Sequence, residues 1–426
     1  MQCLLSFEEQ ASTEKRATSN ESLLIYMYNY DFRLTGYPFR LYSGKDALDR
    51  LPDEVERNRA RRAFIVCGRT VSRKTPLIAH LRQLLGERLA GVFDEIDKDT
   101  ARSSIMRAVE AARAVQADLV IGVGAGSVIQ GARIVTILLA EKRPVEQLVT
   151  QYPEHGPAVS PKLLEPKLPI VNVLTAPTTA QNRAGSRMKD DATARGMEFF
   201  DPKTRPVAIF WDADALLTAP PQLIRTGAAT IWCRAAMNLG GENDNPLVEG
   251  DRLQAYRLAA GALPRIGSGA DAGPRFELCA ATLLQNREAD DGGDQFARHW
   301  AMRVSYAFST ALISVFPQVG QGEGYSALLG AVLRRVGGRD PEAMVRIARG
   351  LGLDGVAPAE APHRIAEKME EGFRALGMPT RLSQLGIARE GLPQVLENSL
   401  RNFNADPRRD FLRERDMLGA LLDSAW

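Results

Sequence analysis

The chain has 426 residues, of which 45% are hydrophobic and 25% charged, and this composition excludes a disordered, fibrous or disulfide-rich small protein. Its 54 Lys and Arg residues nearly balance its 52 Asp and Glu residues, so the net charge of +2 does not indicate a nucleic-acid or membrane partner. The four cysteines are widely separated, and no apolar run approaches the ~20 residues of a membrane helix, so we expect a soluble cytoplasmic protein.

The first 36 residues are polar and irregular, and strand and helix patterns alternate after them. Short apolar runs predict strands within 39–44, 61–68, 91–97, 118–127, 170–179 and 206–214. Apolar residues at helical spacing lie between them, at 75–90 and 101–117. This alternation is typical of a parallel sheet with crossover helices. The proline-rich stretch 145–169 is expected to be a surface excursion.

Long helical patterns dominate from about residue 217 to the C-terminus. The sequence therefore predicts an N-terminal arm (1–36), an α/β nucleotide-binding domain (37–216) and an all-helical domain (217–426).

Two loops that follow predicted strands carry glycine or hydroxyl side chains. The first, GVGAGS at 122–127, brings backbone N–H groups and a helix N-terminus to one place, which suits a phosphate. The second, APTT at 176–179, is followed by AGS at 184–186. Each loop alone is also explained as a capped turn. Together they favour a nucleotide site at the carboxyl ends of the strands.

Four segments, GAGSVIQGAR (124–133), PTTAQNRAGS (177–186), DPKTRPVAIFWDADALLTAPP (201–221) and LGMPTRLSQLG (376–386), precede a final Ala-Trp. Their order and spacing resemble the iron-containing alcohol dehydrogenase superfamily, and the DPKTRP wording most resembles its maleylacetate reductase branch. The resemblance implies the dehydroquinate synthase-like, iron-type alcohol dehydrogenase fold. It also implies a catalytic cleft between the two domains and a homodimer.

The resemblance implies that the phosphates of NAD(P)H lie on one turn, made by Gly124, Ala125, Gly126 and Ser127. Thr178 and Thr179 would then line the nicotinamide side. Gly68 stands where NAD-preferring members carry a carboxylate for the ribose. Because Arg69 follows it, a 2′-phosphate is tolerated, and NADP is as good a candidate as NAD.

The family's metal ligands, an aspartate and several histidines, are replaced in this sequence. By register, the aspartate falls on Ala229 and the first histidine on Cys233. A later histidine falls on Tyr306, with Thr310 at its partner position, and the last becomes Gln321. A cation at these positions would have no carboxylate to balance its charge. We therefore predict that no metal is bound.

Without a metal, another group must stabilise the alkoxide that hydride transfer produces. Tyr306 is the candidate general acid, Arg234 and Gln321 are candidates for holding a substrate carboxylate or carbonyl, and Cys233 is a candidate nucleophile. A core aromatic or an inert buried thiol would explain Tyr306 and Cys233 equally well.

Asp294 and His299 form the remaining carboxylate–histidine pair. Ligands on one helix face are normally three or four residues apart, and these two are five apart. We therefore expect a solvated histidine beside an acidic loop.

The leading hypothesis is a metal-independent NAD(P)H-dependent oxidoreductase that resembles maleylacetate reductase. Its substrate would be a small carbonyl compound or unsaturated keto-acid from the breakdown of aromatic compounds. The alternatives are a lyase, isomerase or hydrolase, or a non-catalytic subunit, on the same scaffold.

Overall fold

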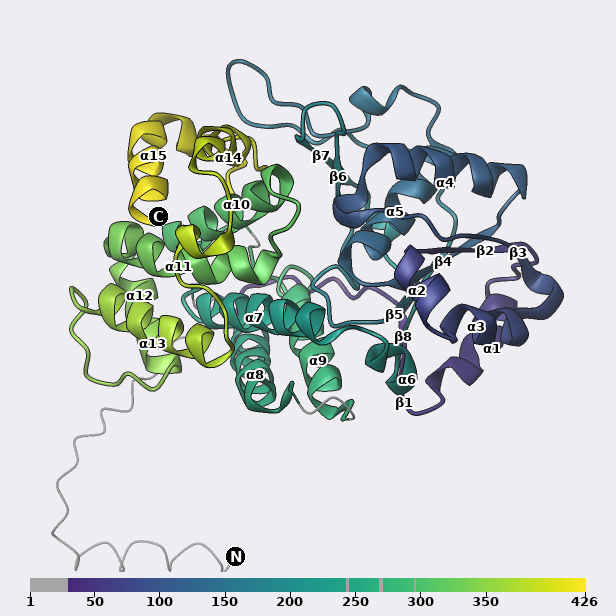
Figure 1. Cartoon of the computed structure of the whole chain (residues 1–426), viewed down its shortest axis with the longest axis horizontal. Helices are drawn as coiled ribbons and strands as arrows, with labels where there is room; N and C mark the ends of the chain where they lie inside the picture. Colours follow the sequence, from purple (N-terminus) through teal and green to yellow (C-terminus); the bar gives the residue numbers. More distant parts are fainter. Residues whose placement is uncertain (1–29, 243–244, 268–270, 295) are drawn as a thin grey trace, which may run out of the picture.

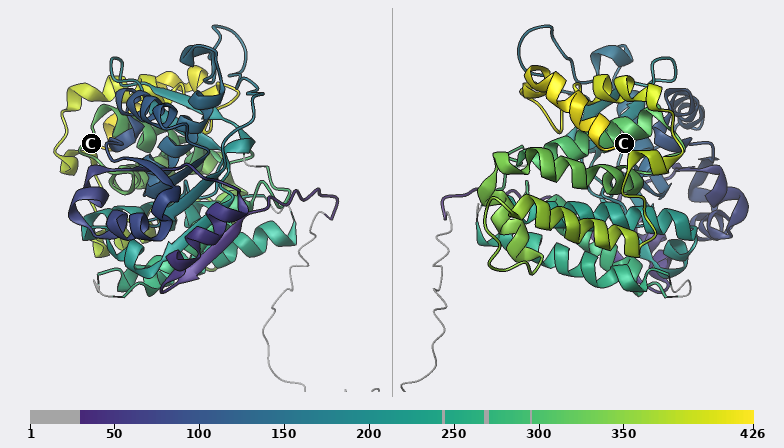
Figure 2. Two further views of the ribbon diagram at one scale, coloured as in Figure 1. Left: turned by 90° about the vertical axis from the view of Figure 1, so that its right-hand side faces the viewer. Right: turned by 60° about the vertical axis from the view of Figure 1, so that its left-hand side comes forward.

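The computed structural model describes residues 30–242, 245–267, 271–294 and 296–426 of the chain. Its two halves lie side by side: an α/β half that runs to about residue 217, and a helical half that follows it (Figures 1 and 2). This arrangement confirms the predicted fold class. Among the described helices, none is both long enough and apolar enough to cross a lipid bilayer.

A six-stranded parallel sheet, in the order β1-β8-β5-β4-β2-β3, forms the centre of the α/β half. Its strands are β1 (Arg40–Gly44), β2 (Ala63–Cys67), β3 (Leu89–Phe93), β4 (Leu119–Gly124), β5 (Ile170–Leu174) and β8 (Ala208–Asp212). The strands β2, β4, β5 and β8 are buried at every position, so their sequences are apolar except for Asn172 in β5 and Asp212 in β8. All six coincide with predicted strands, although β3 ends before the charged residues 94–97.

Helices cover both faces of this sheet. The first face carries α4 (Arg102–Ala114) and α5 (Gly126–Ala140), and the second carries α1 (Leu51–Arg57) and α3 (Leu77–Leu85). The short helix α2 (Arg69–Lys74) begins directly after β2. The strand order reverses between β2 and β4. The loops that leave these two strands therefore diverge and open a crevice, the usual ligand site of such sheets.

An antiparallel hairpin of β6 (Gly185–Lys189) and β7 (Gly196–Phe200) follows the threonine loop, and the sequence analysis does not predict it. Only Ser186 and Met188 of β6 are buried. Because the other positions are glycine or charged, no apolar run marks the strand.

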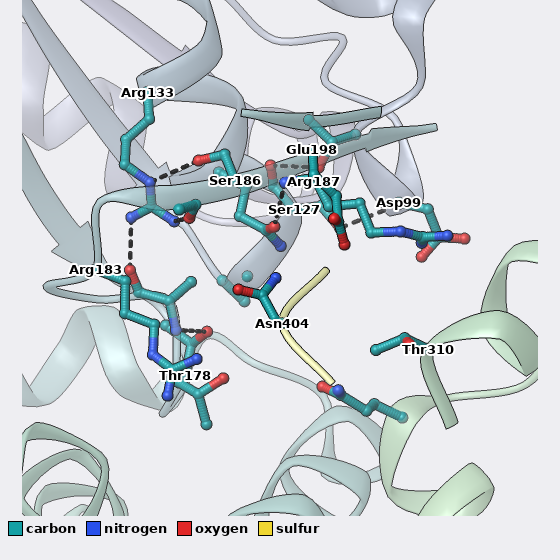
Figure 3. Close-up of a pocket in the computed structure, with 18 of the residues that line it drawn as sticks. Asp99, Ser127, Arg133, Thr178, Arg183, Ser186, Arg187, Glu198, Thr310 and Asn404 are labelled. Carbon is teal, nitrogen blue, oxygen red and sulfur yellow. Dashed lines mark hydrogen bonds between the residues drawn. The ribbon is translucent and has the colours of Figure 1, made fainter. Parts of the chain in front are cut away.

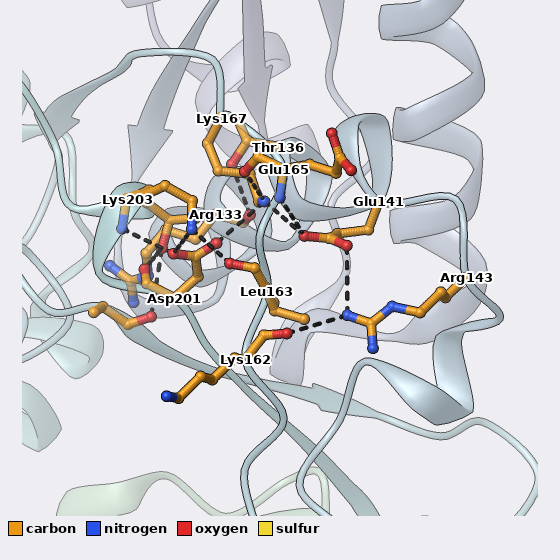
Figure 4. A network of polar contacts seen from close by, with 12 residues as sticks. Arg133, Thr136, Glu141, Arg143, Lys162, Leu163, Glu165, Lys167, Asp201 and Lys203 are labelled. Carbon is orange, nitrogen blue, oxygen red and sulfur yellow. Dashed lines mark hydrogen bonds and ion pairs between the residues drawn. The ribbon is translucent and has the colours of Figure 1, made fainter.

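The proline-rich stretch 145–169 ends in a buried ion-pair network, shown in Figure 4. The Lys167 ammonium is fully buried and lies 2.9 Å from Glu141 Oε1 and 3.2 Å from Asp201 Oδ2. Lys203 lies 3.0 Å from the other oxygen of Asp201. Buried charges are tolerated only when they are paired. The network therefore fixes the DPKTRP segment against the end of α5.

The helical half is built around long buried helices. They are α7 (Pro221–Asn238), α8 (Pro246–Ala262), α9 (Gly273–Arg287), α10 (Trp300–Val315), α11 (Gln321–Val336), α12 (Pro341–Gly350), α13 (Ala361–Ala375), α14 (Leu392–Ser399) and α15 (Arg415–Ser424). The short helix α6 (Ala213–Leu217) packs on β8 and β5 and ends the α/β half. The helix α11 packs against α7, α10 and α13. Nearly every residue in the second half of α7 is buried, since neighbours surround it.

Several contacts join the two halves. Lys98 donates to the carbonyl oxygens of Pro317 and Val319. The Tyr152 hydroxyl donates to Glu198 Oε2 (2.8 Å) and accepts from the backbone N–H of Phe403 (2.9 Å). The stretch 145–169, predicted to be a surface excursion, is therefore anchored to the C-terminal segment.

The described part of the predicted N-terminal arm, residues 30–36, forms no helix and has no strand pairing. The backbone N–H of Thr35 donates to the carbonyl oxygen of Asp290 (2.8 Å), so this part packs on the helical half. Residues 1–29 lie outside the described residues.

Candidate active site

A cavity of about 1360 Å³ lies between the two halves, beyond the carboxyl ends of the strands. Its volume exceeds the ~300–1,000 Å³ of a typical small-molecule pocket, so a dinucleotide and a small substrate fit together. Both sequence-predicted loops line it, through Ala125, Gly126, Ser127, Thr178 and Thr179. The loop between β5 and β6 (175–184), which we call the threonine loop, leaves the cavity open.

The glycine turn presents the N-terminus of the 15-residue helix α5 to the cavity. Free N–H groups and the helix dipole there favour an anion. A Cβ atom on Gly126 would lie 3.3 Å from Thr178 Oγ1, so the two loops approach closely. Gly124, predicted to contact the phosphates, does not line the cavity. A Cβ atom there would lie 2.7 Å from the Cβ of Val128, so Gly124 permits the tight strand-to-helix packing.

Arg133 of α5 holds the threonine loop in place, as Figure 3 shows. Its guanidinium donates to Ser186 Oγ (2.7 Å) and to the carbonyl oxygens of Ala180 (2.6 Å) and Gly185 (3.0 Å). The side chain is 1% exposed, and burial lowers the pKa of Arg133 to about 9. A planar guanidinium suits three acceptors at once.

The loop after β2 differs from the sequence prediction. Gly68 precedes α2 but does not line the cavity, whereas Thr70 and Asp97 do. The Arg69 guanidinium, expected to be available for a 2′-phosphate, lies 2.9 Å from Asp97 Oδ1 and 3.4 Å from Glu95 Oε2. The wall of the cavity therefore carries the Asp97 carboxylate at this point, and the Arg69 guanidinium is already ion-paired.

The helix α7 turns a different face to the cavity than the sequence register predicts. Thr226, Thr230 and Arg234, at four-residue spacing, line the cavity. Ala229 and Cys233 point into the helical core. Cys233 is 1% exposed, and burial raises the pKa of its thiol. The structure thus places Arg234 in the site and places the candidate nucleophile Cys233 outside it.

The residues predicted on α10 and α11 do reach the cavity: Tyr306, Thr310 and Gln321. The Thr310 hydroxyl donates to the carbonyl oxygen of Tyr306 (2.8 Å) and accepts from Asn402 Nδ2 (2.7 Å). Figure 3 shows Thr310 approaching from the helical half. The Tyr306 hydroxyl makes no hydrogen bond to any residue that the structure describes, although it lies among polar groups.

Three arginines gather around Tyr306: Arg183, Arg234 and Arg298. Arg234 is 3% exposed, its Nε has no hydrogen-bond partner among the described residues, and its guanidinium carbon lies 5.8 Å from the centre of the Tyr306 ring. Arg183 Nε donates to the neutral amide oxygen of Asn286 (2.6 Å). Burial and then the positive charge of Arg234 lower the pKa of Arg183 to about 9. We call these three side chains the arginine cluster.

Two models of one family match most of the chain: iron-containing alcohol dehydrogenase at residues 38–213, and the C-terminal part of this family at residues 244–425. The chain belongs to the iron-containing alcohol dehydrogenase family.

Its relatives support the predicted similarity to the maleylacetate reductase branch of this family. Maleylacetate reductase 2 of Cupriavidus pinatubonensis is 26% identical over 239 residues, which are 54% of this chain and 55% of that protein. Maleylacetate reductase of Burkholderia cepacia is 25% identical over 402 residues, 91% of this chain and 95% of that protein. The chain thus spans about half of the former relative and nearly all of the latter.

Solved structures confirm the fold. The NADH-dependent butanol dehydrogenase A of Thermotoga maritima superposes with a TM-score of 0.79 at 18% identity, covering 94% of this chain and 99% of that one.

The helical side of the cavity carries positive charge, from Arg234 and Arg298. In the described part of the chain, no group of three or more His, Cys, Asp or Glu side chains is placed to hold a metal ion.

The prediction of a solvated His299 is wrong, because this side chain is 7% exposed. Its Nδ1 accepts from the N–H of Met302 (3.3 Å) at the start of α10, and its Nε2 lies 3.0 Å from the carbonyl oxygen of Met237.

The sequence analysis missed Arg183 and Arg298 as site residues of this family member. Both lie in loops, one within the extended threonine loop and one just before α10. In the sequence, each is only an arginine in a predicted loop near a residue already considered for the site. Many surface loops contain such an arginine, so the pattern does not identify a site residue. Their convergence with Arg234 depends on the tertiary structure.

Proposed function

We propose that this protein reduces a small carbonyl compound with hydride from NAD(P)H and without a metal ion. In this proposal, Tyr306 and Arg234 stabilise the developing alkoxide in place of the metal ion that the family resemblance implies. The observation that carries it is the buried Arg234 guanidinium, which faces the cavity beside a tyrosine hydroxyl that has no partner among the described residues. The maleylacetate reductases among its relatives favour an unsaturated keto-acid as substrate.

The residues at the expected ligand positions do not suit a divalent cation. Ala229 and Cys233 face the core, and the cavity-facing side chains next to them and at the other positions are Thr230, Arg234, Tyr306, Thr310 and Gln321. None is a carboxylate or imidazole, and the guanidinium repels a cation. The charge of the arginine cluster therefore supports a site that works through fixed donors.

When bound, NAD(P)H supplies the hydride that becomes attached to the carbonyl carbon. The helix N-terminus at 125–127 would hold its phosphates, and Thr178 and Thr179 would line the nicotinamide side. Tyr306 donates its hydroxyl proton to the carbonyl oxygen, so hydride plus proton convert the carbonyl to an alcohol. Arg234 stabilises the resulting tyrosinate, which regains a proton from water.

A Tyr306→Phe variant is expected to lower kcat about 100-fold, because the proton donor is lost while the ring still fills its place. The affinity for NADH and the melting temperature should stay near wild type. The measurement is steady-state oxidation of NADH with a panel of small keto-acids and aldehydes.

Tyr325→Phe is the matched control, since Tyr325 is buried in the helical core and does not line the cavity. It should keep kcat at a modest cost in stability. Retained turnover in Tyr306→Phe would remove Tyr306 as the acid. Failure of both NADH and NADPH to bind at millimolar concentration, or one tightly held divalent ion per chain by elemental analysis, would overturn the proposed function.

The acidic environment of Arg69 bears on the choice of nucleotide. Because Asp97 lines the cavity, we propose that a ribose hydroxyl is preferred over a 2′-phosphate. The wild-type protein is expected to bind NADH about tenfold more tightly than NADPH. An Asp97→Asn variant, which removes the carboxylate from the cavity and leaves Arg69 paired with Glu95 alone, should reduce this ratio. The ratio of dissociation constants measured by nucleotide fluorescence tests this, and an unchanged ratio would contradict it.

A further inference from the structure

We propose that the arginine cluster is an anion subsite, and that the carbonyl substrate carries a group with two negative charges there. Such a group is a phosphate, a phosphonate or a pair of carboxylates. This inference rests on the proposed function, because it specifies the class of compound that the same cavity reduces.

The first argument is the balance of charge around the cluster. Three guanidiniums converge near Tyr306. The nearby carboxylate of Glu288 binds the guanidinium of Arg252 and also interacts with the charge of Arg298, so it is not available to Arg183 or Arg234. Arg303, also close by, is neutralised by Asp406 and Asp410.

Within the cluster, Arg234 has no ion-pair partner among the described residues, and Arg183 has only the neutral partner Asn286. A single carboxylate on a ligand would compensate only one of these two charges. A dianion would compensate the charges of both Arg183 and Arg234.

The second argument is the shape of the site. A recess of about 40 Å³ adjoins the main cavity and is lined by Arg183, Arg234, Arg298 and Tyr306 among others. Since one water molecule needs ~10–15 Å³, the recess accepts a compact head group but not a long chain. Tyr306 lines both the recess and the main cavity. The anionic group and the reacting carbonyl therefore lie on either side of one tyrosine, which implies a short substrate with only a few bonds between them.

The third argument concerns the cost of the empty cluster. Like charges at close range repel, and burying a guanidinium without a partner destabilises the fold. Arg234 is such a residue, and Arg183 and Arg298 add positive charge close to it. A chain that keeps Arg234 there loses stability in favour of ligand binding, a common feature of functional sites. The protein without ligand should therefore become more stable when one of the charges is removed.

The test uses the full-length protein without nucleotide, in buffer at pH 8 and constant ionic strength. Inorganic phosphate and malonate are the two dianionic probes, and acetate and chloride are the monoanionic controls. We expect the melting temperature to rise saturably with at least one dianion at millimolar concentration, and the monoanions to bind at least about tenfold more weakly. Phosphate alone would identify a phosphate or phosphonate substrate, and malonate alone a dicarboxylate.

Arg234→Gln should raise the melting temperature of the ligand-free protein and abolish its response to dianions. Arg364→Gln is the matched control, since Arg364 is an exposed residue of α13 outside both cavities and should leave the response intact. Two results would overturn the inference: no dianion response in the wild-type protein, or a full response in Arg234→Gln.

These outcomes are distinguishable from failure of the proposed function. Dianion binding without NAD(P)H binding would leave the subsite standing and refute the reductase. NADH-dependent reduction of neutral aldehydes, with no response to dianions, would support the reductase and refute the anion subsite.

Discussion

A Gly126→Asp variant is expected to lose nucleotide binding while it keeps its fold. The new carboxylate would stand at the N-terminus of α5, where the structure directs N–H groups into the cavity. Like charges placed together cost several kcal/mol, so we expect the dissociation constant for NADH to rise at least about 100-fold. The backbone of Gly126 does not have a positive φ, and an acidic residue suits a helix N-terminus, so the melting temperature should change little.

Gly126→Ala is the matched control for this experiment. Its Cβ atom would meet Thr178 Oγ1 at 3.3 Å, which requires only a small adjustment of that hydroxyl. NADH affinity in Gly126→Ala should therefore stay within about fivefold of wild type. Titration of NADH fluorescence, together with the melting curve of each variant, gives both quantities. Unchanged affinity in Gly126→Asp would show that the glycine turn serves packing alone.

An Arg133→Ala variant is expected to lose both stability and nucleotide affinity. The substitution leaves three acceptors without their donor inside the α/β half: Ser186 Oγ and the carbonyl oxygens of Ala180 and Gly185. Breaking a buried charge network of this kind lowers the free energy of unfolding by about 3 kcal/mol. Because the same contacts position the threonine loop, NADH should bind more weakly even where the variant is fully folded.

Arg133→Lys tests whether the positive charge of Arg133 or the planar geometry of its guanidinium is responsible for the stability. An ammonium group keeps the charge but cannot present the planar fork to all three acceptors, so its stability should lie between wild type and Arg133→Ala. Arg113→Ala, on the exposed face of α4, is the control and should change the unfolding free energy by no more than about 0.5 kcal/mol. Denaturant unfolding measures the series. Equal stability of Arg133→Ala and Arg113→Ala would contradict the role of Arg133.

The α/β half was the most predictable part of this protein. Buried parallel strands need apolar runs because both of their faces are covered, and β2, β4, β5 and β8 meet that requirement at every residue except Asn172 and Asp212. The hairpin of β6 and β7 lacked such a run and could not be recognised. The glycine and threonine loops were predictable as partners because parallel strands place their carboxyl ends at one edge of the sheet.

The sequence was least informative on α7. Its second half is buried on almost every side, so hydrophobic periodicity cannot show which residues face a cavity. The family register pointed to Ala229 and Cys233, and the structure instead turns Thr230 and Arg234 toward the site. A rotation of one residue around a helix decides between an inert thiol and a buried cation.

By itself, the sequence determined the alternation of helices with the six strands of the parallel sheet, the glycine and threonine loops that line the cavity, and the family, because these depend on local patterns along the chain. Only the tertiary structure decided which charges meet. Arg183, Arg234 and Arg298 come from a loop of the α/β half, a helix, and a segment before another helix. Electrostatic interaction depends on distance in space rather than on separation in sequence. The convergence of these three charges is therefore seen only in the folded structure, where both halves line one cavity.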